Sequence, residues 1–295
     1  APPGRLGRPG QSPCCLREWL KFGTEYLQDR EVADAGTDAW LLLEYVTNIN
    51  RSYYFMHMQE KMNREEAKEY RELLKRRGER EPVQYITGEA WFYGRSFLVN
   101  PSVLIPRQDT EVLVEEVLKR AMPGMRVLDL CTGSGCILLT ILKEASVSGV
   151  GSDISGDALQ VAERNGKRLK VHAGWIESNL FEKIGGTFDL IVSNPPYIAS
   201  AVIPELEPEV REHEPLLALD GHGDGLYFYR KIVEEAPAYL KAGGWLCLEI
   251  GWDQGEILRR LLQAAGFVSV EIVKDLSGLD RVALGRLPVS GEHKE

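Results

Sequence analysis

The sequence predicts an α/β fold: a doubly wound seven-stranded sheet with a final antiparallel hairpin, preceded by a small N-terminal helical domain. Three observations lead to this prediction. From residue 126 onward, short runs rich in valine, leucine and isoleucine alternate with amphipathic stretches, which is typical of a largely parallel sheet with helices on both faces. The last two apolar runs follow each other without a helical stretch, so they predict a hairpin. Residues 16–81, in contrast, show helical periodicity.

Residues 1–81 predict a tail followed by a helical domain. Residues 1–15 are rich in proline, glycine and arginine, so we expect a disordered tail, an expression remnant or a processed leader there. Apolar residues recur at helical spacing between Leu16 and Leu27, and Trp40–Val46 is a second apolar stretch. Arg64–Arg77 carries one apolar stripe beneath a densely charged face. We therefore place a helical domain at 16–81.

Residues 82–106 have a different character. They are rich in aromatic and β-branched residues, and Gly88 and Gly94 interrupt them, so we predict a β-hairpin that links two domains. Asp109 or Thr110 can cap a helix that continues to Met122. The second domain is predicted over residues 107–288, and a short tail over 289–295.

Within the second domain, apolar runs and amphipathic stretches give the individual elements. We expect strands at Arg126–Leu130, Gly149–Ser152, Val171–Ile176, Phe188–Ser193, Trp245–Ile250, Val268–Val273 and Arg281–Gly285. We expect helices at Cys136–Glu144, Gly156–Asn165, Gly225–Tyr239 and Asp253–Ala265.

Composition excludes several classes of protein. The formal net charge of -9 argues against a protein whose main task is to bind a phosphate backbone. The five cysteines are odd in number and scattered, and none has metal-ligand spacing with a histidine, so we expect a reduced protein without a metal site. No apolar run approaches the roughly 18 residues that span a bilayer. We expect a cytoplasmic protein, with an organelle left open because the unusual first residues would hide a leader.

A glycine-containing turn follows the first strand of the second domain. Val127–Leu130 leads into Gly133 and Gly135, and a helix is expected to begin at Cys136. Glycines at such a turn let the backbone approach a ligand at the carboxyl ends of the strands. The turn lacks the third glycine of a dinucleotide fingerprint and the lysine of a P-loop, so a nucleoside without a pyrophosphate fits better.

Two acidic residues accompany this turn. Asp129 lies at the end of its strand, and Asp153 closes the next strand, about 20 residues further on, where a carboxylate can accept both hydrogen bonds of a ribose diol. A tight strand-to-helix turn with an acidic helix cap is the structural alternative. The two acids together favour a ligand site.

The strand Phe188–Ser193 runs directly into Asn194-Pro195-Pro196-Tyr197. Two prolines end the strand and fix the backbone dihedrals. A planar NH2 group needs two acceptors in its plane, and the Asn194 side-chain oxygen and the Pro195 carbonyl could supply them. This grip would hold a poorly nucleophilic amide nitrogen in line with a methyl donor and stabilise its developing positive charge. Tyr197 could stack on the amide.

The alternative for this segment is a proline-rich turn after a buried strand, which is a common feature. Its position argues for function. The segment ends the fourth strand of the domain, which neighbours the first strand in a doubly wound topology.

Together these residues resemble the HemK/PrmC-type release factor glutamine methyltransferases, from about Leu16 to Leu287. Four stretches carry the resemblance: Phe92–Phe97, Leu104–Glu111, Asp129–Gly135 and Asn194–Tyr197. Residues 212–219 also look like the family's loop after the catalytic motif. Asn-Pro-Pro-Tyr alone is shared with amino-methylating DNA enzymes, whereas Ile-Pro-Arg-x-Asp-Thr-Glu is more specific.

The resemblance implies a helical domain that docks a peptide chain release factor and a Rossmann-like methyltransferase domain. The latter would use S-adenosylmethionine to methylate the glutamine of a Gly-Gly-Gln loop, giving S-adenosylhomocysteine. The cofactor-binding residues would be Asp129, Cys131, Thr132, Gly133, Ser134, Gly135, Asp153, Asn179, Leu180 and Asn194. The catalytic and substrate-binding residues would be Asn194, Pro195, Pro196 and Tyr197, with Arg107 and Glu111 at the substrate mouth.

Some assignments keep an alternative. Arg107 and Glu111 could equally form a structural salt bridge at a helix start. At 179–180 the family often has Asp followed by an aromatic residue or leucine, so Asn179 and Leu180 would present an amide to adenine without aromatic stacking. Cys131 and Cys136 are interpreted as small buried residues rather than thiolates. The acidic run from Glu205 to Glu214 is either a solvated loop or a surface for a basic factor, and His213 and His222 are interpreted as loop residues.

Two rival functions are weighed against glutamine methylation. A DNA or RNA adenine amino-methyltransferase needs the same two acceptors, but it also needs a basic surface and an extruded base. A non-catalytic module that binds S-adenosylmethionine is opposed by the intact Asn-Pro-Pro-Tyr. We expect a monomer that acts on release factors, without membrane association or direct nucleic-acid binding.

Overall fold

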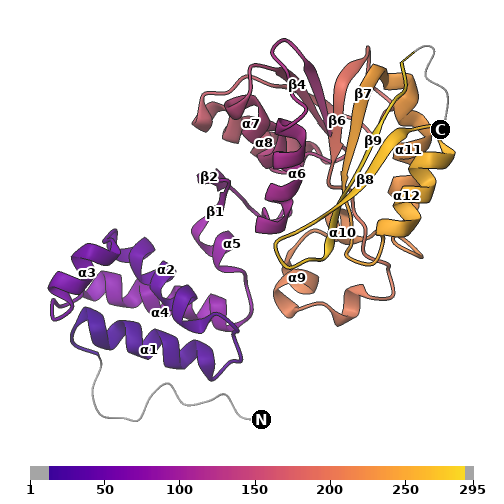
Figure 1. Ribbon diagram of the computed structural model, residues 1–295. Coiled ribbons are helices and arrows are strands. Elements are labelled where there is room, and N and C mark those ends of the chain that lie inside the picture. Colours follow the sequence, from indigo (N-terminus) through magenta and orange to yellow (C-terminus); the bar gives the residue numbers. More distant parts are fainter. Residues whose placement is uncertain (1–12, 290–295) are drawn as a thin grey trace. The chain divides into compact units, whose positions relative to one another are not determined.

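The computed structural model describes residues 13–289 and divides into two compact units, and Figure 1 labels most of their elements. Residues 1–12 and 290–295, which belong to the two predicted tails, lie outside the described residues. The first unit comprises the chain up to Gly88 together with Pro208–His213, and the second comprises Glu89–Glu207 and the chain from Glu214 onward.

The first unit is helical, as the sequence predicts. Its helices are α1 (Leu16–Gln28), α2 (Ala35–Thr47), α3 (Arg51–His57), α4 (Arg64–Gly78), α5 (Val83–Thr87) and α9 (Pro208–His213). Trp19, Leu43 and Tyr70 belong to its core. Asn63 and Glu66 form a reciprocal capping box that starts α4, which satisfies two backbone N–H groups.

A buried ion-pair network joins separate stretches of this unit. The Arg77 guanidinium lies 2.7 Å from Asp38 Oδ2 and 2.9 Å from Glu209 Oε1, and Arg80 donates to both oxygens of Glu209. The partial burial of Glu209 raises its pKa, but the two guanidiniums outweigh this effect and lower that pKa to about 2. Glu209 of the acidic run is therefore part of a folded unit and not of a solvated loop.

The second unit contains the predicted seven-stranded sheet. The small sheet of this unit pairs β1 (Glu89–Phe92) with β2 (Arg95–Leu98). The strands of the large sheet are β3 (Arg126–Leu130), β4 (Ser148–Asp153), β5 (Gly174–Glu177), β6 (Phe188–Ser193), β7 (Leu240–Glu249), β8 (Val268–Lys274) and β9 (Asp280–Arg286). The large sheet has the order β5-β4-β3-β6-β7-β9-β8. The strands from β5 to β7 are parallel, whereas β9 pairs antiparallel with both β7 and β8. β3 and β6 are neighbours, as predicted.

Helices cover both faces of the sheet (Figure 1). The helices of this unit are α6 (Glu111–Leu118), α7 (Cys136–Glu144), α8 (Gly156–Leu169), α10 (Leu216–Leu219), α11 (Tyr227–Tyr239) and α12 (Gly255–Ala264), with short 3-10 turns at Gln108–Thr110 and Ile203–Glu205. One core layer joins α6 and α7 to the sheet, through residues such as Leu113 and Val192. The other joins α11 and α12 to it, through residues such as Ile232 and Leu258.

The structure differs from the prediction at residues 82–88. Instead of an extended strand, this stretch forms the single-turn helix α5, and the hairpin is limited to β1 and β2. Pro82 precedes the turn, and Gly88 ends it with a left-handed φ of 76°. These caps favour one helical turn over the extended preference of β-branched and aromatic residues. The helix expected to reach Met122 ends at Leu118, and α3 was not predicted.

Candidate active site

A cavity of about 420 Å³ lies within the second unit, at the carboxyl ends of the strands. Its lining comes from the segments that follow β3, β4, β5 and β6, and from residues before α6 and around α10 and α11. Of the predicted site residues, those that line it are Arg107, Cys131, Thr132, Gly133, Ser134, Asp153, Asn179, Leu180, Asn194 and Pro196. Asp129, Gly135, Pro195, Tyr197 and Glu111 are not among the lining residues.

The glycine turn, Cys131–Gly135, is held by local hydrogen bonds. Gly133 N donates to Asp153 Oδ2 at 2.9 Å, and Thr132 N donates to the Ser152 carbonyl at 2.9 Å. Gly135 has a φ of 78°, and a Cβ there would lie 3.0 Å from the Trp175 ring, so both conformation and packing require glycine. The turn therefore depends on the neighbouring strand β4 for its shape.

Asp153 faces the cavity with both carboxylate oxygens already oriented. Oδ2 accepts from Gly133 N, and Oδ1 accepts from Ser155 N at 3.0 Å. Burial raises the pKa of Asp153, and the backbone N–H donors counteract this effect. Each carboxylate oxygen keeps a further lone pair, so hydrogen bonds from a ribose diol remain chemically feasible.

Asp129 is fully buried beneath the turn and does not line the cavity. Its Oδ2 accepts from Thr132 Oγ1 at 2.6 Å, while Oδ1 has no hydrogen-bond partner among the described residues. Burial raises the pKa of Asp129 to about 7. In this structure Asp129 supports the turn through Thr132, and a direct contact with a cofactor stays a prediction.

Asn194-Pro195-Pro196-Tyr197 begins where β6 ends beside β3. Ser193 Oγ donates to the Leu130 carbonyl at 2.7 Å, which ties the two strand ends together. Asn194 and Pro196 line the cavity next to the glycine turn. The ring of Tyr197 packs against the apolar core, and its hydroxyl lies 3.4 Å from Glu249 Oε1. The Tyr197 ring therefore supports the motif from behind, and stacking on an amide stays a prediction.

Asn179 and Leu180, after β5, line the cavity as expected. Asn179 Nδ2 donates to Glu182 Oε1 at 2.7 Å, which leaves its side-chain oxygen as an acceptor toward a ligand. Leu180 has a positive φ of 48° and is buried. An amide and an aliphatic side chain therefore stand at this end of the cavity, and no aromatic ring comes from positions 179 and 180.

Arg107 and Glu111 have different environments. Arg107 lines the cavity and forms an ion pair with the buried carboxylate of Glu214, which also accepts from Ile105 N at 3.0 Å. Glu111 lies away from the cavity, and its Oε1 accepts from Tyr93 N at 2.8 Å. The two residues thus do not pair with each other. Glu214 is the second member of the acidic run that is not a solvated loop residue.

Sequence reasoning missed an aromatic wall of the cavity, formed by His222, Tyr227 and Phe228. The His222 ring meets the Tyr227 ring edge-on, with centroids 4.5 Å apart. The glycines before this wall were the available signal. A Cβ at Gly225 would lie 2.4 Å from the Tyr197 carbonyl oxygen, so the loop can pack on the Asn-Pro-Pro-Tyr segment only through glycine.

The cysteines at the turn are not activated. Burial raises the pKa of the Cys131 thiol well above its usual range and that of Cys136 to about 12. Both thiols are therefore protonated at neutral pH. Cys136 is buried, as interpreted from the sequence, whereas Cys131 is half-buried and lines the cavity.

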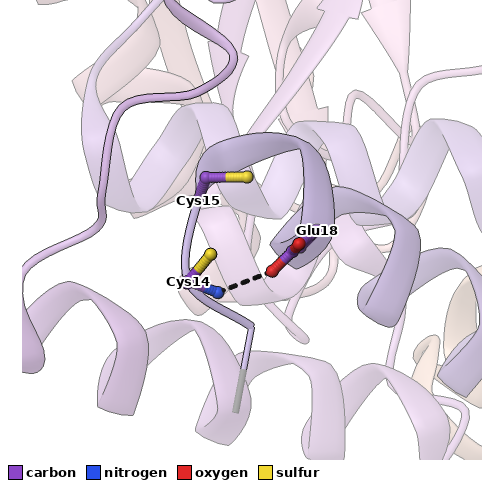
Figure 2. Close-up of side chains that lie close together, drawn as sticks. All are labelled: Cys14, Cys15 and Glu18. Carbon is purple, nitrogen blue, oxygen red and sulfur yellow. Dashed lines mark hydrogen bonds between the residues drawn. The ribbon is translucent and has the colours of Figure 1, made fainter. Parts of the chain in front are cut away.

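Outside this unit, one group of potential metal ligands occurs among residues 13–289. Cys14, Cys15 and Glu18 bring one ligand atom each to within 4.8 Å of one another (Figure 2). Glu18 also accepts a hydrogen bond from Cys14 N at 2.8 Å, and this bond lowers the pKa of Glu18. The carboxylate therefore already accepts a backbone hydrogen bond at the first turn of α1.

No helix in the described part of the chain is long and apolar enough to cross a membrane.

Comparisons with known proteins agree with this geometry. The family model for the PrmC N-terminal domain matches residues 18–88, and that for the methyltransferase small domain matches residues 107–206. A release factor glutamine methyltransferase of Geobacter sulfurreducens is 43% identical over 274 residues, which is 92% of this chain and 96% of that protein. The protein of the same name from Bacillus subtilis is 39% identical and covers 90% of this chain and 95% of its own length.

A solved methyltransferase from Pyrococcus furiosus has a similar fold. It matches with a TM-score of 0.52 at 18% identity, covering 67% of this chain and 91% of that chain. The shared architecture supports the α/β fold of the second unit.

Proposed function

Because the chain belongs to the family of release factor glutamine methyltransferases, we propose that it methylates the Gly-Gly-Gln glutamine of peptide chain release factors. The methyl group would pass from S-adenosylmethionine to the side-chain amide nitrogen. One observation carries this proposal: Asn194 and Pro196 line the same cavity as the glycine turn. An amide-binding segment and a nucleoside-binding turn thus share one space.

The residues present fit S-adenosylmethionine. We assign its ribose to Asp153 and its adenine to the end of the cavity near Asn179 and Leu180, where apolar and polar groups are both available. The glycine turn lets the backbone approach the remaining part of the cofactor. When bound, the cofactor supplies a methyl group on a sulfonium, which is activated for transfer without a covalent enzyme intermediate.

We assign the acceptor role to Asn194 and Pro195. An amide nitrogen is a weak nucleophile because its lone pair is delocalised into the carbonyl group. The Asn194 side-chain oxygen and the Pro195 carbonyl would accept both hydrogens of the glutamine NH2 and so fix its plane. As the nitrogen–carbon bond forms and the carbon–sulfur bond breaks, these oxygens would stabilise the positive charge on nitrogen. The extra proton then leaves to water.

The predicted partner and location follow from the same proposal. We propose that the enzyme acts as a monomer in the cytoplasm, where release factors work, and that it does not bind nucleic acid directly. The formal net charge of -9 supports the last point, because backbone-binding proteins carry basic surfaces.

A methyl-transfer assay tests the function. Radiolabelled S-adenosylmethionine is incubated with the enzyme and, in separate reactions, with a release factor, its Gly-Gly-Gln→Gly-Gly-Ala variant, DNA and RNA. We expect label on the intact release factor alone, with mass spectrometry placing it on the glutamine. Label on adenine in either nucleic acid, with none on the release factor, would reject the proposal in favour of an adenine methyltransferase.

A further inference from the structure

We propose that Gln254 is a positioning residue for this reaction, holding the main chain of Asn-Pro-Pro-Tyr against the loop that leads into the aromatic wall. The inference rests on the proposed function above. Gln254 follows β7 at the start of α12 and is almost fully buried, although it does not line the cavity. It therefore acts through other residues.

The side-chain amide of Gln254 joins three segments that are far apart in the sequence. Its Oε1 accepts from Gly251 N at 2.8 Å. Its Nε2 donates to the Tyr197 carbonyl at 3.1 Å and reaches the Gly225 carbonyl at 3.5 Å. Because an amide NH2 carries two hydrogens, one side chain can serve both carbonyls at once.

The close packing of this loop on the Tyr197 carbonyl makes a buried donor necessary. A Cβ at Gly225 would lie 2.4 Å from the Tyr197 oxygen, and a Cβ at Gly221 would lie 2.9 Å from the Tyr197 carbonyl carbon. The loop thus rests directly on the peptide that follows the motif, where water has little access. Buried carbonyls need a hydrogen-bond partner, and Gln254 supplies it.

Fixing Tyr197 constrains the two proposed acceptors. Only Pro195 and Pro196 separate it from Asn194, and proline holds φ near −65°. A fixed Tyr197 carbonyl therefore limits where the Pro195 carbonyl and the Asn194 side chain can point. A second contact helps, because the Tyr197 hydroxyl lies 3.4 Å from Glu249 Oε1. Gln254 thus binds the main chain of Tyr197, and Glu249 contacts its side chain.

The test uses two nearly isosteric substitutions. In Gln254→Glu, an ionised carboxylate cannot donate to either carbonyl, and in Gln254→Met no donor exists at any pH. We expect kcat for release factor methylation to fall about 10- to 100-fold in both variants at pH 8, with little change in the Kd of S-adenosylmethionine. Gln263→Glu, on an exposed position of the same helix, adds the same charge and should keep the wild-type kcat.

The pH profile separates a donor role from general damage to the fold. As pH falls from about 8 to 6, protonation gives the introduced carboxyl group an O–H donor, so the kcat ratio of Gln254→Glu to wild type should rise. The ratio for Gln254→Met should stay flat. Other titratable and charged groups lie around this position: Tyr197, Tyr229, Glu249, Asp253, Asp280 and Arg281. Dividing by the wild-type kcat at each pH controls for their titration.

Amide hydrogen exchange gives a second measurement that needs no substrate. The amides of Asn194 and of residues 197–200 should exchange faster in Gln254→Met than in wild type, and at the wild-type rate in Gln263→Glu. Wild-type kcat in Gln254→Met, or unchanged exchange in Gln254→Met, would overturn the positioning role. A wild-type enzyme that fails to methylate a release factor would instead reject the proposed function, and the exchange result would still decide the role of Gln254.

Discussion

The two sides of the cavity are held in different ways. The glycine turn is fixed by its own neighbourhood: Thr132 and Gly133 bond to Ser152 and Asp153, at the end of the adjacent strand β4. The Asn-Pro-Pro-Tyr segment is fixed from a distance, because Tyr197 contacts Gly225, Glu249 and Gln254. The proposed cofactor side is thus held by one adjacent strand, and the proposed acceptor side by several more distant segments of the chain.

This difference predicts that variants on the two sides affect different measurements. Damage to the glycine turn should weaken cofactor binding first. Damage to the supports of the acceptor side should slow methyl transfer while the cofactor still binds.

Asn194→Ala should have the largest effect. It removes one of the two proposed acceptors of the amide hydrogens, so we expect a loss of about 10²- to 10³-fold in kcat. The Kd of S-adenosylmethionine, measured by calorimetry, should change much less than kcat, measured by single-turnover transfer. Equal losses in both would contradict the division between the two sides.

Asp153→Ala should weaken the cofactor side next. It removes the carboxylate proposed to bind the ribose and also leaves Gly133 N without its acceptor, so we expect Kd to rise about 10- to 100-fold. Single-turnover transfer at saturating S-adenosylmethionine should recover most of the wild-type rate. Asp153→Asn keeps an acceptor oxygen for Gly133 N and should bind better than Asp153→Ala. A rate that stays low at saturation would place Asp153 on the acceptor side as well.

Gly225→Ala tests the packing of the distant loop on Tyr197. The new Cβ would lie 2.4 Å from the Tyr197 oxygen at a φ of 75°, so we expect kcat to fall about tenfold and stability to fall by roughly 1–3 kcal/mol. Gly223→Ala is the matched control in the same loop, because nothing lies within 4 Å of its Cβ and its φ is ordinary. Kinetics and denaturant unfolding would measure both. Similar behaviour of the two variants would argue against this contact.

The last prediction concerns the pH dependence of stability and two buried carboxyls, one behind each side of the cavity. Burial raises the pKa of Asp129 from 3.8, and that of Glu249 from 4.5, to about 7. The folded chain therefore binds more protons than the unfolded chain between these values, so stability is highest below about pH 4 for these groups and is lost as pH rises through 7. Over the whole range each group contributes roughly 3–4 kcal/mol to this loss of stability.

Glu249→Gln should flatten part of this dependence. The amide cannot ionise, so the free energy of unfolding should fall less than in wild type between about pH 5 and 8, as measured by urea unfolding. Asp129→Asn should do the same on the cofactor side. Glu271→Gln, at an exposed position of β8, is the control and should leave the slope unchanged. An unchanged slope in Glu249→Gln would show that Glu249 does not titrate in this range.

The difference between the two sides also explains what could be predicted from the sequence. The glycine turn, Asp153 and Asn-Pro-Pro-Tyr are contiguous or lie at the ends of strands whose apolar runs are plain, so β3, β6 and their adjacency were predicted correctly. Gln254 carries no such signal and Gly225 only that of a glycine-rich loop, because their contacts with Tyr197 exist only after folding. The sequence predicts only a loop residue at His222 for the same reason.

Local composition misled the prediction where tertiary contacts override it. Glu209 and Glu214 stand in an acidic run that suggests solvent exposure. However, Arg77 and Arg80 form ion pairs with Glu209, and Arg107 forms one with Glu214. Residues 83–87 have a strong extended preference, but Pro82 and Gly88 cap them as one helical turn. In both cases a few neighbours decide the structure, and single-residue propensities do not identify them.

The ion pairs of Glu209 have a practical consequence for dissecting the protein. The helical unit is assembled from two stretches of chain, one ending at Gly88 and one of six residues at Pro208–His213. A fragment truncated at Gly88 would lose the acid that Arg77 and Arg80 share, and the complementary fragment would carry an orphaned helix. Experiments on the separate roles of the two units are therefore better done by point substitution in the intact polypeptide than by expressing the two units as separate fragments.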